Sequence, residues 1–245
     1  MRQSRLIRQR IWERLKEVAV PDARFHTDFS SFIPDFAGSS EATERLMAHV
    51  AAAGDGLVFV TPDNSMAALR VALAKAGRPF VISTYNIRRG FLLLEAGALA
   101  SDLAFAAAWL DGIEHFAQPI SLREICAFER FAFLATGASA VTTDGLRFGK
   151  GHGFFDLEWG MFSDVGLVGD RTPVFAVVHD VQVVDDRLPP SATDIAVDFI
   201  ATPSRLISVE RQHRRPRGIR WELLAHDEIA ENPPLAELAR LRGIA

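Results

Sequence analysis

The stretch "RFGKGHGFFDLEW", residues 147–159, decides the fold that we expect for this chain. It follows "SAVTTDG", residues 139–145, a short run that predicts a strand. Its glycines alternate with Lys150 and His152, and apolar residues recur at helical spacing after Gly153. A strand, a glycine-rich turn and a helix in this order are typical of α/β proteins.

The composition of the turn favours an anion-binding site. The N-terminus of a helix presents unpaired main-chain N–H groups and the positive end of the helix dipole. Gly149, Gly151 and Gly153 permit positive φ angles and let an anion approach the backbone closely. Arg147 and Lys150 add fixed positive charges, so we expect phosphate to bind here.

A carboxylate stands close to the same turn. Asp156 lies in the first turn of the expected helix, where it could hold a Mg²⁺ beside bound phosphates. The run is neither a P-loop nor the dinucleotide-binding fingerprint, because Phe154 stands where the third glycine would fall. A tight turn without a ligand is therefore the alternative, and the nearby charges favour phosphate.

Strands and helices alternate around this turn. The runs "GLVFVTPD" (56–63) and "PFVIST" (79–84) predict buried strands, and a helix capped by Asp63 or Asn64 between them implies a parallel βαβ unit. Further strands are expected at residues 173–180, 194–203 and 206–210, and helices at 4–18 and 41–53. We predict one α/β domain over residues 1–245, with a mostly parallel sheet, helices on both faces and antiparallel strands at the end.

Composition excludes several classes of protein. The chain has 245 residues, 49% of them hydrophobic, which is enough for a sizeable core. A net charge of −4 argues against a protein that binds nucleic acids or membrane surfaces as a whole. The single cysteine, Cys126, excludes an internal disulfide and is expected to be buried. Glu95 and Asp102 interrupt the most apolar stretch, residues 90–113, so we expect no membrane span and a cytoplasmic protein.

Arginines gather at three further places. Arg5 and Arg8 share one face of the expected N-terminal helix with Trp12, although a solvated face would show the same spacing. Arg88 follows a strand end, where open α/β sheets usually bind ligands, and a surface loop is the alternative. The basic loop at residues 211–220 could bind RNA, but a local patch on an acidic chain is weak support for that function.

Two segments resemble a known family. "RFGKGHGFFD" resembles the Arg-aliphatic-Gly-x-Gly-x-Gly-Tyr-Tyr-Asp signature of the 5-formyltetrahydrofolate cyclo-ligase (methenyltetrahydrofolate synthetase) family. "VFAVVHDVQVVDDRLPPSATDIAVDFIATPSRLI" resembles that family's strand, Gln, Leu-Pro, Asp, x-x-x-Asp, strand pattern. The residues that fall on these patterns are Arg147, Gly149, Gly151, Gly153, Asp156, Gln182, Pro189, Asp194 and Asp198.

The N-terminal half resembles one branch of the family. "IRQRIWERL", "SFIPDFAGSSEATERL" and "VTPD" look like the methenyltetrahydrofolate synthetase domain-containing proteins and the cyclo-ligase-like proteins of plants and bacteria. That branch is suspected of having left the original reaction, and its plant members are linked to thiamin metabolism.

The resemblance implies a fold, a reaction and two cofactors. The fold is α/β, of the ribose-5-phosphate isomerase and CoA-transferase type. The reaction uses ATP and Mg²⁺: the formyl oxygen of 5-formyltetrahydrofolate attacks the γ-phosphate, and N10 then closes the ring and expels phosphate. The task of the protein would be positioning and charge neutralisation.

The resemblance also assigns roles to residues of this chain. Nucleotide binding is expected from Arg5, Arg8, Arg147, Gly149, Lys150, Gly151, His152, Gly153, Phe154 and Asp156. Catalysis is expected from Arg147 and Lys150, substrate binding from Asp63, Arg88 and Phe155, and metal binding from Asp156 and Asp194.

Departures from the family pattern leave the second substrate open. Phe154 and Phe155 replace the signature tyrosines, so stacking area is kept and hydroxyls are lost. Ser4 replaces a lysine, and Asp63 with Asn64 replaces a folate-contacting glutamate segment. We therefore expect the nucleotide site to be retained. The second substrate is a folate or a thiamin-related compound, and a non-catalytic nucleotide- or RNA-binding module is the third hypothesis.

Overall fold

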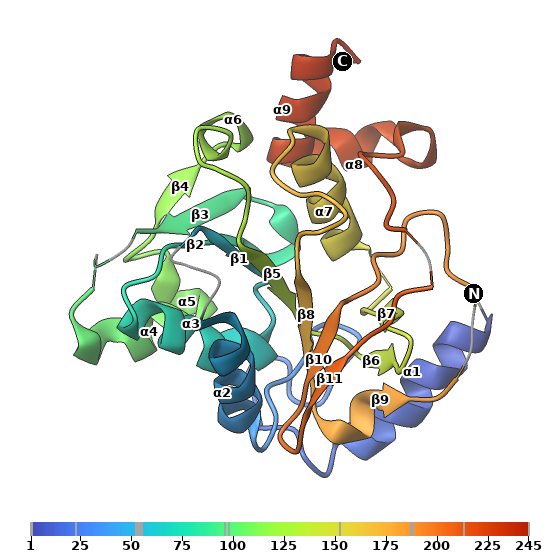
Figure 1. Ribbon diagram of the computed structural model, residues 1–245. Coiled ribbons are helices and arrows are strands. Elements are labelled where there is room, and N and C mark those ends of the chain that lie inside the picture. Colours follow the sequence, from blue (N-terminus) through green and yellow to red (C-terminus); the bar gives the residue numbers. More distant parts are fainter. Residues whose placement is uncertain are drawn as a thin grey trace.

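An eight-stranded mixed sheet runs through the middle of the molecule (Figure 1). The computed structural model describes residues 2–22, 24–51, 56–95, 97, 99–151, 153–186, 189–212 and 214–244. In spatial order the strands are β11 (Leu206–Ser208), β10 (Phe199–Ala201), β8 (Val174–Val177), β5 (Phe133–Thr136), β1 (Val58–Val60), β2 (Phe80–Ser83), β3 (Phe91–Leu94) and β4 (Gln118–Ile120). The pairings from β10 across to β2 are parallel, and those of β11, β3 and β4 are antiparallel. This confirms the expected α/β class with a mostly parallel sheet.

The central strands are short apolar runs that are buried along their whole length. In the register of the sheet, Phe59 of β1 lies beside Val81 of β2 and Leu134 of β5. These three residues belong to one hydrophobic core, whereas their neighbours Val58 and Phe133 belong to another. Successive side chains of a strand point to opposite faces, so the same strands supply both cores.

Helices cover both faces of the sheet (Figure 1). On one face lie α2 (Ser39–Val50) and α3 (Ala67–Lys75), which place Leu46 and Leu69 in the same core as Val58. On the other face lie α7 (Phe154–Asp164) and α9 (Pro233–Arg242). The Phe162 ring of α7 meets the Phe59 ring of β1 at a centroid distance of 4.9 Å. The expected helices on both faces are therefore present.

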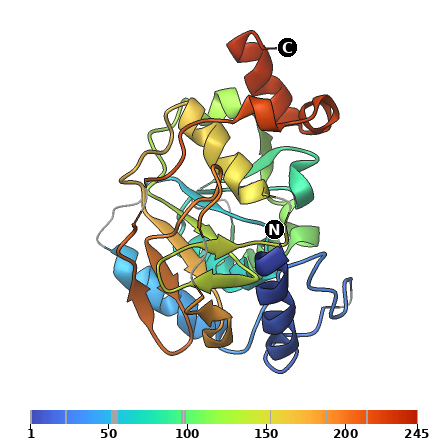
Figure 2. The same cartoon turned by 90° about the vertical axis from the view of Figure 1, so that its right-hand side faces the viewer.

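A second, smaller sheet carries the N-terminal helix. Its strands are β7 (Arg147–Phe148), β6 (Ala140–Thr142) and β9 (Val183–Val184), in that order. Ile7, Ile11 and Leu15 of α1 (Arg2–Leu15) form a separate core with Phe148 and other residues of this sheet. Figure 2 shows α1 lying beside the small sheet. The strand expected at 139–145 therefore exists but belongs to this sheet, which the sequence did not reveal.

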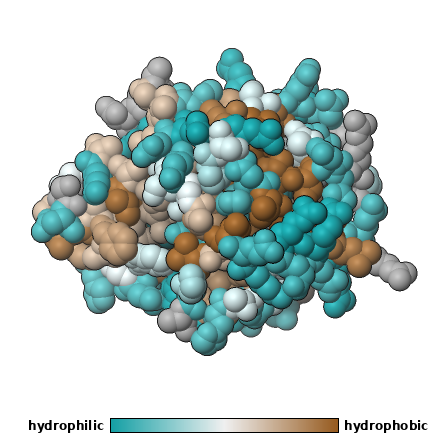
Figure 3. All heavy atoms as spheres, turned by 90° about the horizontal axis from the view of Figure 1, so that it is seen from below, coloured by the Kyte–Doolittle hydropathy of each residue, from teal (hydrophilic) through white to brown (hydrophobic). Residues whose placement is uncertain are grey.

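The apolar middle of the chain folds into short elements. After β3 come α4 (Ala104–Ala108), α5 (Leu110–Ile113) and α6 (Leu122–Ile125), and α8 (His226–Glu231) precedes α9. The Ser121 and Glu124 side chains form a capping box at the start of α6. No helix among the described residues is long and apolar enough to cross a membrane. On the face drawn in Figure 3, hydrophobic side chains gather toward the middle and hydrophilic ones surround them.

The strand expected at 194–203 is shorter than predicted. Strand β10 begins only at Phe199, so Asp194 and Asp198, which both fall within the expected range, lie before the strand. Asp198 instead pairs with Arg211 and Arg215 of the basic loop. The Arg215 guanidinium is buried over the Trp159 ring, 4.9 Å from its centroid. Part of the basic loop is thus occupied in holding the fold together.

Candidate functional site

A cavity of about 770 Å³ opens at the carboxyl ends of the central strands. Thr61 and Asp63 follow β1, Ser83 ends β2 and Thr136 ends β5, and all four line the cavity. This edge of the sheet is where open α/β folds usually bind ligands, and the volume suits a nucleotide or a cofactor-sized molecule.

The glycine-rich turn forms one wall of the cavity. Gly151 and Gly153 have φ angles of 113° and 68°, a region that favours glycine. Gly153 is the N-cap of α7, so the positive end of this helix faces the cavity. Within the described part of the chain, the main-chain N–H groups of Lys150, Gly151 and Gly153 donate no hydrogen bond. They are available to an anion, as the sequence predicts.

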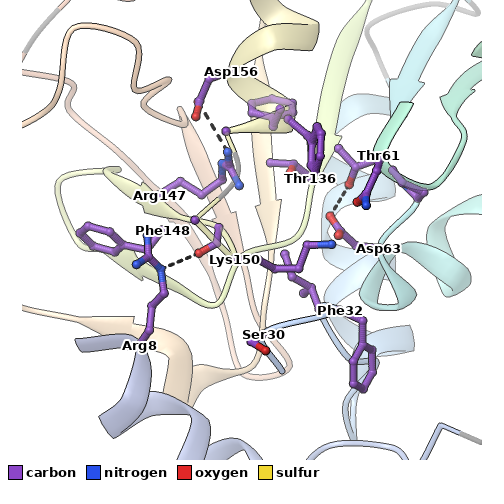
Figure 4. A pocket seen from close by; sticks show the side chains of 18 of the residues that line it. Arg8, Ser30, Phe32, Thr61, Asp63, Thr136, Arg147, Phe148, Lys150 and Asp156 are labelled. Carbon is purple, nitrogen blue, oxygen red and sulfur yellow. Dashed lines mark hydrogen bonds and ion pairs between the residues drawn. The ribbon is translucent and has the colours of Figure 1, made fainter. Parts of the chain in front are cut away.

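Two arginines flank the turn (Figure 4). Arg8 of α1 donates a hydrogen bond from Nε to the carbonyl oxygen of Gly149, at 2.7 Å. Arg147 of β7 is almost buried; its guanidinium lies 3.5 Å from an Asp156 oxygen and 4.8 Å from the centre of the Phe155 ring. Burial lowers the pKa of Arg8, and the nearby Arg147 adds to this effect, yet the Arg8 guanidinium stays charged at neutral pH. The turn therefore lies in a positive field.

Lys150 reaches away from the turn, toward an aromatic wall. Its Nζ donates to the carbonyl oxygen of Ser31 at 3.1 Å and lies 5.0 Å from the centre of the Tyr85 ring. Tyr85 stacks on Phe25, which stacks on Phe32, with centroid distances of 5.8 and 5.1 Å. In Figure 4 the Lys150 side chain extends from the turn toward Asp63. A planar ring could lie against this wall while phosphates occupy the turn.

The opposite side of the cavity is acidic (Figure 4). One oxygen of Asp63, Oδ2, accepts hydrogen bonds from Thr61 Oγ1 at 2.6 Å and from the main-chain N–H of Gly137 at 3.0 Å. The fully buried Arg70 of α3 donates to the carbonyl oxygens of Thr61 and Asp63, both at 3.0 Å. These contacts fix the position of Asp63, and within the described residues its second oxygen, Oδ1, accepts no hydrogen bond.

Asp156 and Asp194 are the candidate metal ligands, and both line the cavity. Burial raises the pKa of Asp156 to about 6; Arg147 opposes this rise and Asp194 adds to it. Among the described residues, no group of three or more His, Cys, Asp or Glu side chains could hold a metal ion. Mg²⁺ is commonly held by one or two carboxylates together with substrate phosphates. This pair therefore fits a Mg²⁺ that arrives with a nucleotide, and does not fit a cage built by the protein alone.

Glu158 is a cavity residue that the sequence reasoning missed. It lies on α7 and is only 1% exposed. Burial raises its pKa to about 8, while the Ser83 hydroxyl and Arg147 act in the opposite direction. Its Oε2 has no hydrogen-bond partner in the described structure. A signal was available: Glu158 falls on the same helical stripe as Phe155 and Phe162, and an acid in a buried stripe is unusual.

The cavity brings together most of the residues expected at the site. Those that line it are Arg5, Arg8, Asp63, Arg147, Gly149, Lys150, Gly151, Gly153, Phe154, Phe155, Asp156 and Asp194. Arg88 does not line the cavity and is exposed; its neighbours Asn86 and Ile87 line it instead. His152 lies outside the described residues. The expectation that Cys126 is buried is wrong, because this residue is exposed. Gln182, which falls on the family pattern, is buried, and its amide donates a hydrogen bond to the carbonyl oxygen of Ala138 at 2.6 Å.

The fold and the cavity define a class of protein: an α/β protein with an anion-binding turn at the carboxyl edge of a mostly parallel sheet. The model of the 5-formyltetrahydrofolate cyclo-ligase family matches residues 1–203, so the chain belongs to this family, which is a family of enzymes. The resemblance found in the sequence is thereby confirmed.

Curated relatives place the chain beside one branch of the family. It is 31% identical over 241 residues to a methenyltetrahydrofolate synthase domain-containing protein of Danio rerio, covering 96% of this chain and 61% of the relative. The protein of the same name from Homo sapiens is 29% identical over 237 residues, covering 95% of this chain and 60% of the relative. The chain therefore spans only about 60% of the length of these relatives.

One solved structure shows a slight likeness. It is a 5,10-methenyltetrahydrofolate synthetase from Mycoplasma pneumoniae, with 10% identity and a TM-score of 0.43 over 84% of this chain and 99% of that chain. A likeness at this level supports no argument about function.

Proposed function

We propose that this chain binds ATP with Mg²⁺ in the cavity and converts 5-formyltetrahydrofolate into 5,10-methenyltetrahydrofolate, or closes a ring in a closely related substrate. The observation that carries the proposal is the turn before α7: its main-chain N–H groups are unbonded in the described structure and face a cavity between Arg8 and Arg147. Membership of the cyclo-ligase family supplies the reaction.

The geometry supports a mechanism by positioning. The N–H groups of the turn and the guanidinium of Arg8 would hold the β- and γ-phosphates, and Arg147 would neutralise charge that develops on the transferred group. The formyl oxygen attacks the γ-phosphorus and ADP leaves; N10 then attacks the activated carbon and phosphate leaves. Asp156 and Asp194 would hold Mg²⁺, which would neutralise phosphate charge.

The proposal can be tested by following the absorbance of the methenyl product with saturating ATP and Mg²⁺. We expect Arg8→Ala to weaken ATP binding by about tenfold or more, because it removes a charge next to the turn. Arg14→Ala is the matched control, because Arg14 is an exposed residue of the same helix. A protein that does not bind ATP in calorimetry would contradict the proposal.

Calorimetry also tests a variant of this function, in which the nucleotide site is kept and the second substrate is thiamin-related. Phe154 and Phe155 line the cavity where the family signature has tyrosines, so the hydroxyls of that wall are missing. ATP binding without any binding of 5-formyltetrahydrofolate would favour this variant, and tight folate binding would contradict it.

A further inference from the structure

Two neighbouring polar groups of the cavity wall are buried with little support from the described part of the protein. Glu158 of α7 and Ser83 at the end of β2 are each 1% exposed, and both line the cavity. The Ser83 hydroxyl is close enough to lower the pKa of Glu158, yet neither Oε2 of Glu158 nor Oγ of Ser83 makes a hydrogen bond of normal geometry in the described structure. A buried polar atom without a well-formed hydrogen bond is unfavourable, so this pair beside a cavity points to a ligand that completes it.

The charges of the cavity limit what this ligand group can be. Arg8 and Arg147 lie on the side of the glycine turn, and Asp63 lies across the cavity from them (Figure 4). Asp63, Arg147 and Asp156 all act on Glu158 electrostatically, so two carboxyl groups and one guanidinium group surround it. The excess of carboxyl groups disfavours a phosphate or a carboxylate there, and the free Oε2 lone pairs favour a group that donates hydrogen bonds.

We propose that Glu158 and Ser83 form a subsite that recognises the aminopyrimidine edge of the second substrate. Such an edge offers an amino group, and in folates also a ring N–H, to the carboxyl group, and it offers a ring nitrogen or, in folates, a carbonyl oxygen to the hydroxyl. The ring systems of folates and of thiamin both contain this edge. The inference rests on the proposed function and deepens it, because it names the part of the second substrate that selects the binding mode.

Asp63 and Glu158 differ in how well the protein supports their carboxyl groups. Asp63 already accepts hydrogen bonds from Thr61 and from the main chain of Gly137, so its position is fixed by the protein. Glu158 receives no comparable support at Oε2, although it stands on a stripe of α7 where an apolar residue would pack more favourably. A purely structural glutamate in such a place would have its oxygens paired within the protein.

Calorimetric titrations of Glu158→Met, Glu158→Gln and Ser83→Ala test the subsite. The probes are ATP, 5-formyltetrahydrofolate, thiamin and p-aminobenzoylglutamate, which lacks the aminopyrimidine ring. We expect Glu158→Met to weaken binding of the ring-containing ligand by at least about tenfold and to change ATP affinity by less than about twofold. Glu158→Gln should restore most of the affinity, because its amide keeps an acceptor. Glu44→Gln, on an exposed site of α2, is the matched control.

The outcomes separate the subsite from the proposed function. If thiamin binds and folate does not, and binding depends on Glu158, the subsite stands and the folate reaction fails. If folate binds equally well to the wild type and to Glu158→Met, the subsite is contradicted and the folate reaction stands. The subsite also fails if p-aminobenzoylglutamate and ATP lose as much affinity as the ring-containing ligand, or if Glu158→Gln is as weak as Glu158→Met.

Discussion

Two acidic residues of α7 show how the pKa of a carboxyl group depends on its position along the helix. Asp156 lies in the first turn and keeps an arginine partner, and its pKa rises to about 6 because of burial. Glu158 lies two residues further into the helix, without an ion-pair partner among the described residues, and its pKa rises to about 8 for the same reason. Burial therefore outweighs the nearby positive charge at both positions, and more so at the deeper one.

The first prediction concerns the pH dependence of stability. The pKa of Glu158 is about 8 in the folded protein, above its ordinary value of 4.5, so the folded state binds this proton more tightly than the unfolded state. The free energy of unfolding should therefore fall as pH rises from 4.5 to 8, and the loss is complete above pH 8. Glu158→Gln should remove this component, leaving the variant more stable than the wild type at pH 8.5 by about 2 kcal/mol or more.

Urea unfolding of both proteins at pH 5 and pH 8.5 measures the effect. The difference between wild type and variant isolates Glu158 from Asp156, which titrates in the same range and is present in both. Glu44→Gln should leave the pH dependence unchanged. Equal pH dependence in the wild type and in Glu158→Gln would show that this carboxyl is ionised in the folded protein.

The second prediction concerns the backbone of the turn. Gly151 has a φ of 113°, so Gly151→Ala strains the backbone and misplaces the N–H groups that face the cavity. We expect a loss of about 1–2 kcal/mol in the free energy of unfolding and a loss of ATP affinity of about tenfold or more. Gly166→Ala is the control, because Gly166 has a φ of 80° and open space around it but lies at the opposite end of α7 from the turn. It should lose stability without losing ATP affinity.

Sequence alone predicted some of these residues and not others. The turn was found because glycines and cations are neighbours in the chain, and the family pattern pointed to Asp194. Arg70 was not found, because its role depends on carbonyl groups of Thr61 and Ala108, which only the tertiary structure brings together. Arg88 was expected at the site because it follows a strand end, but the chain turns away after Ile87.

At the scale of elements, helix α1 is attached to the small sheet and is not part of the main core. Ile7, Ile11 and Leu15 lie on one face of α1 and pack against the small sheet. Arg5 and Arg8 lie on another face of the same helix and line the cavity. The central strands of the main sheet were predictable from their apolar runs. The small sheet was not, because β7 and β9 are only two residues long and β9 pairs with β6 across a wide sequence separation.

The third prediction follows from this attachment. Ile11→Ala removes a fully buried side chain from the α1 core and should cost about 2–4 kcal/mol. Because Arg8 is positioned by this helix, ATP affinity should fall as well, although Ile11 belongs to a core apart from the main sheet. Leu6→Ala is the control, since Leu6 lies on the same helix and is 58% exposed. Unchanged ATP binding in a folded Ile11→Ala protein would separate α1 from the nucleotide site.

At the scale of the whole molecule, the cavity concentrates positive charge in a chain whose net charge is −4. The cationic side is built from α1 and β7, and the carboxylates Asp156 and Asp194 stand next to it. A triphosphate is therefore attracted by the arginines and repelled by the carboxylates, unless a divalent cation stands between them.

The fourth prediction uses this balance. ATP should stabilise the folded protein more strongly with Mg²⁺ than with EDTA, and a ligand at 100 times its Kd raises the free energy of unfolding by about 2.7 kcal/mol. Asp194→Asn should reduce the difference between the two conditions, because one candidate ligand of the ion is lost. Thermal unfolding with ATP, with and without Mg²⁺, measures this. Asp102→Asn, at an exposed site outside the cavity, is the control, and equal Mg²⁺ dependence in all three proteins would remove Asp194 from the metal site.

The hydrogen bond from Arg8 to Gly149 joins two residues that are 141 positions apart in the chain. The cavity wall that we propose to bind the triphosphate is thus complete only after α1 docks onto a segment that is synthesised much later. A fragment that ends before residue 147 would retain α1 and several strands but would lack the glycine-rich turn. A fragment that lacks α1 would keep the turn but would lack Arg8 beside it. We therefore expect nucleotide binding to appear only at the last stage of folding, when α1 has docked onto the segment that contains Gly149.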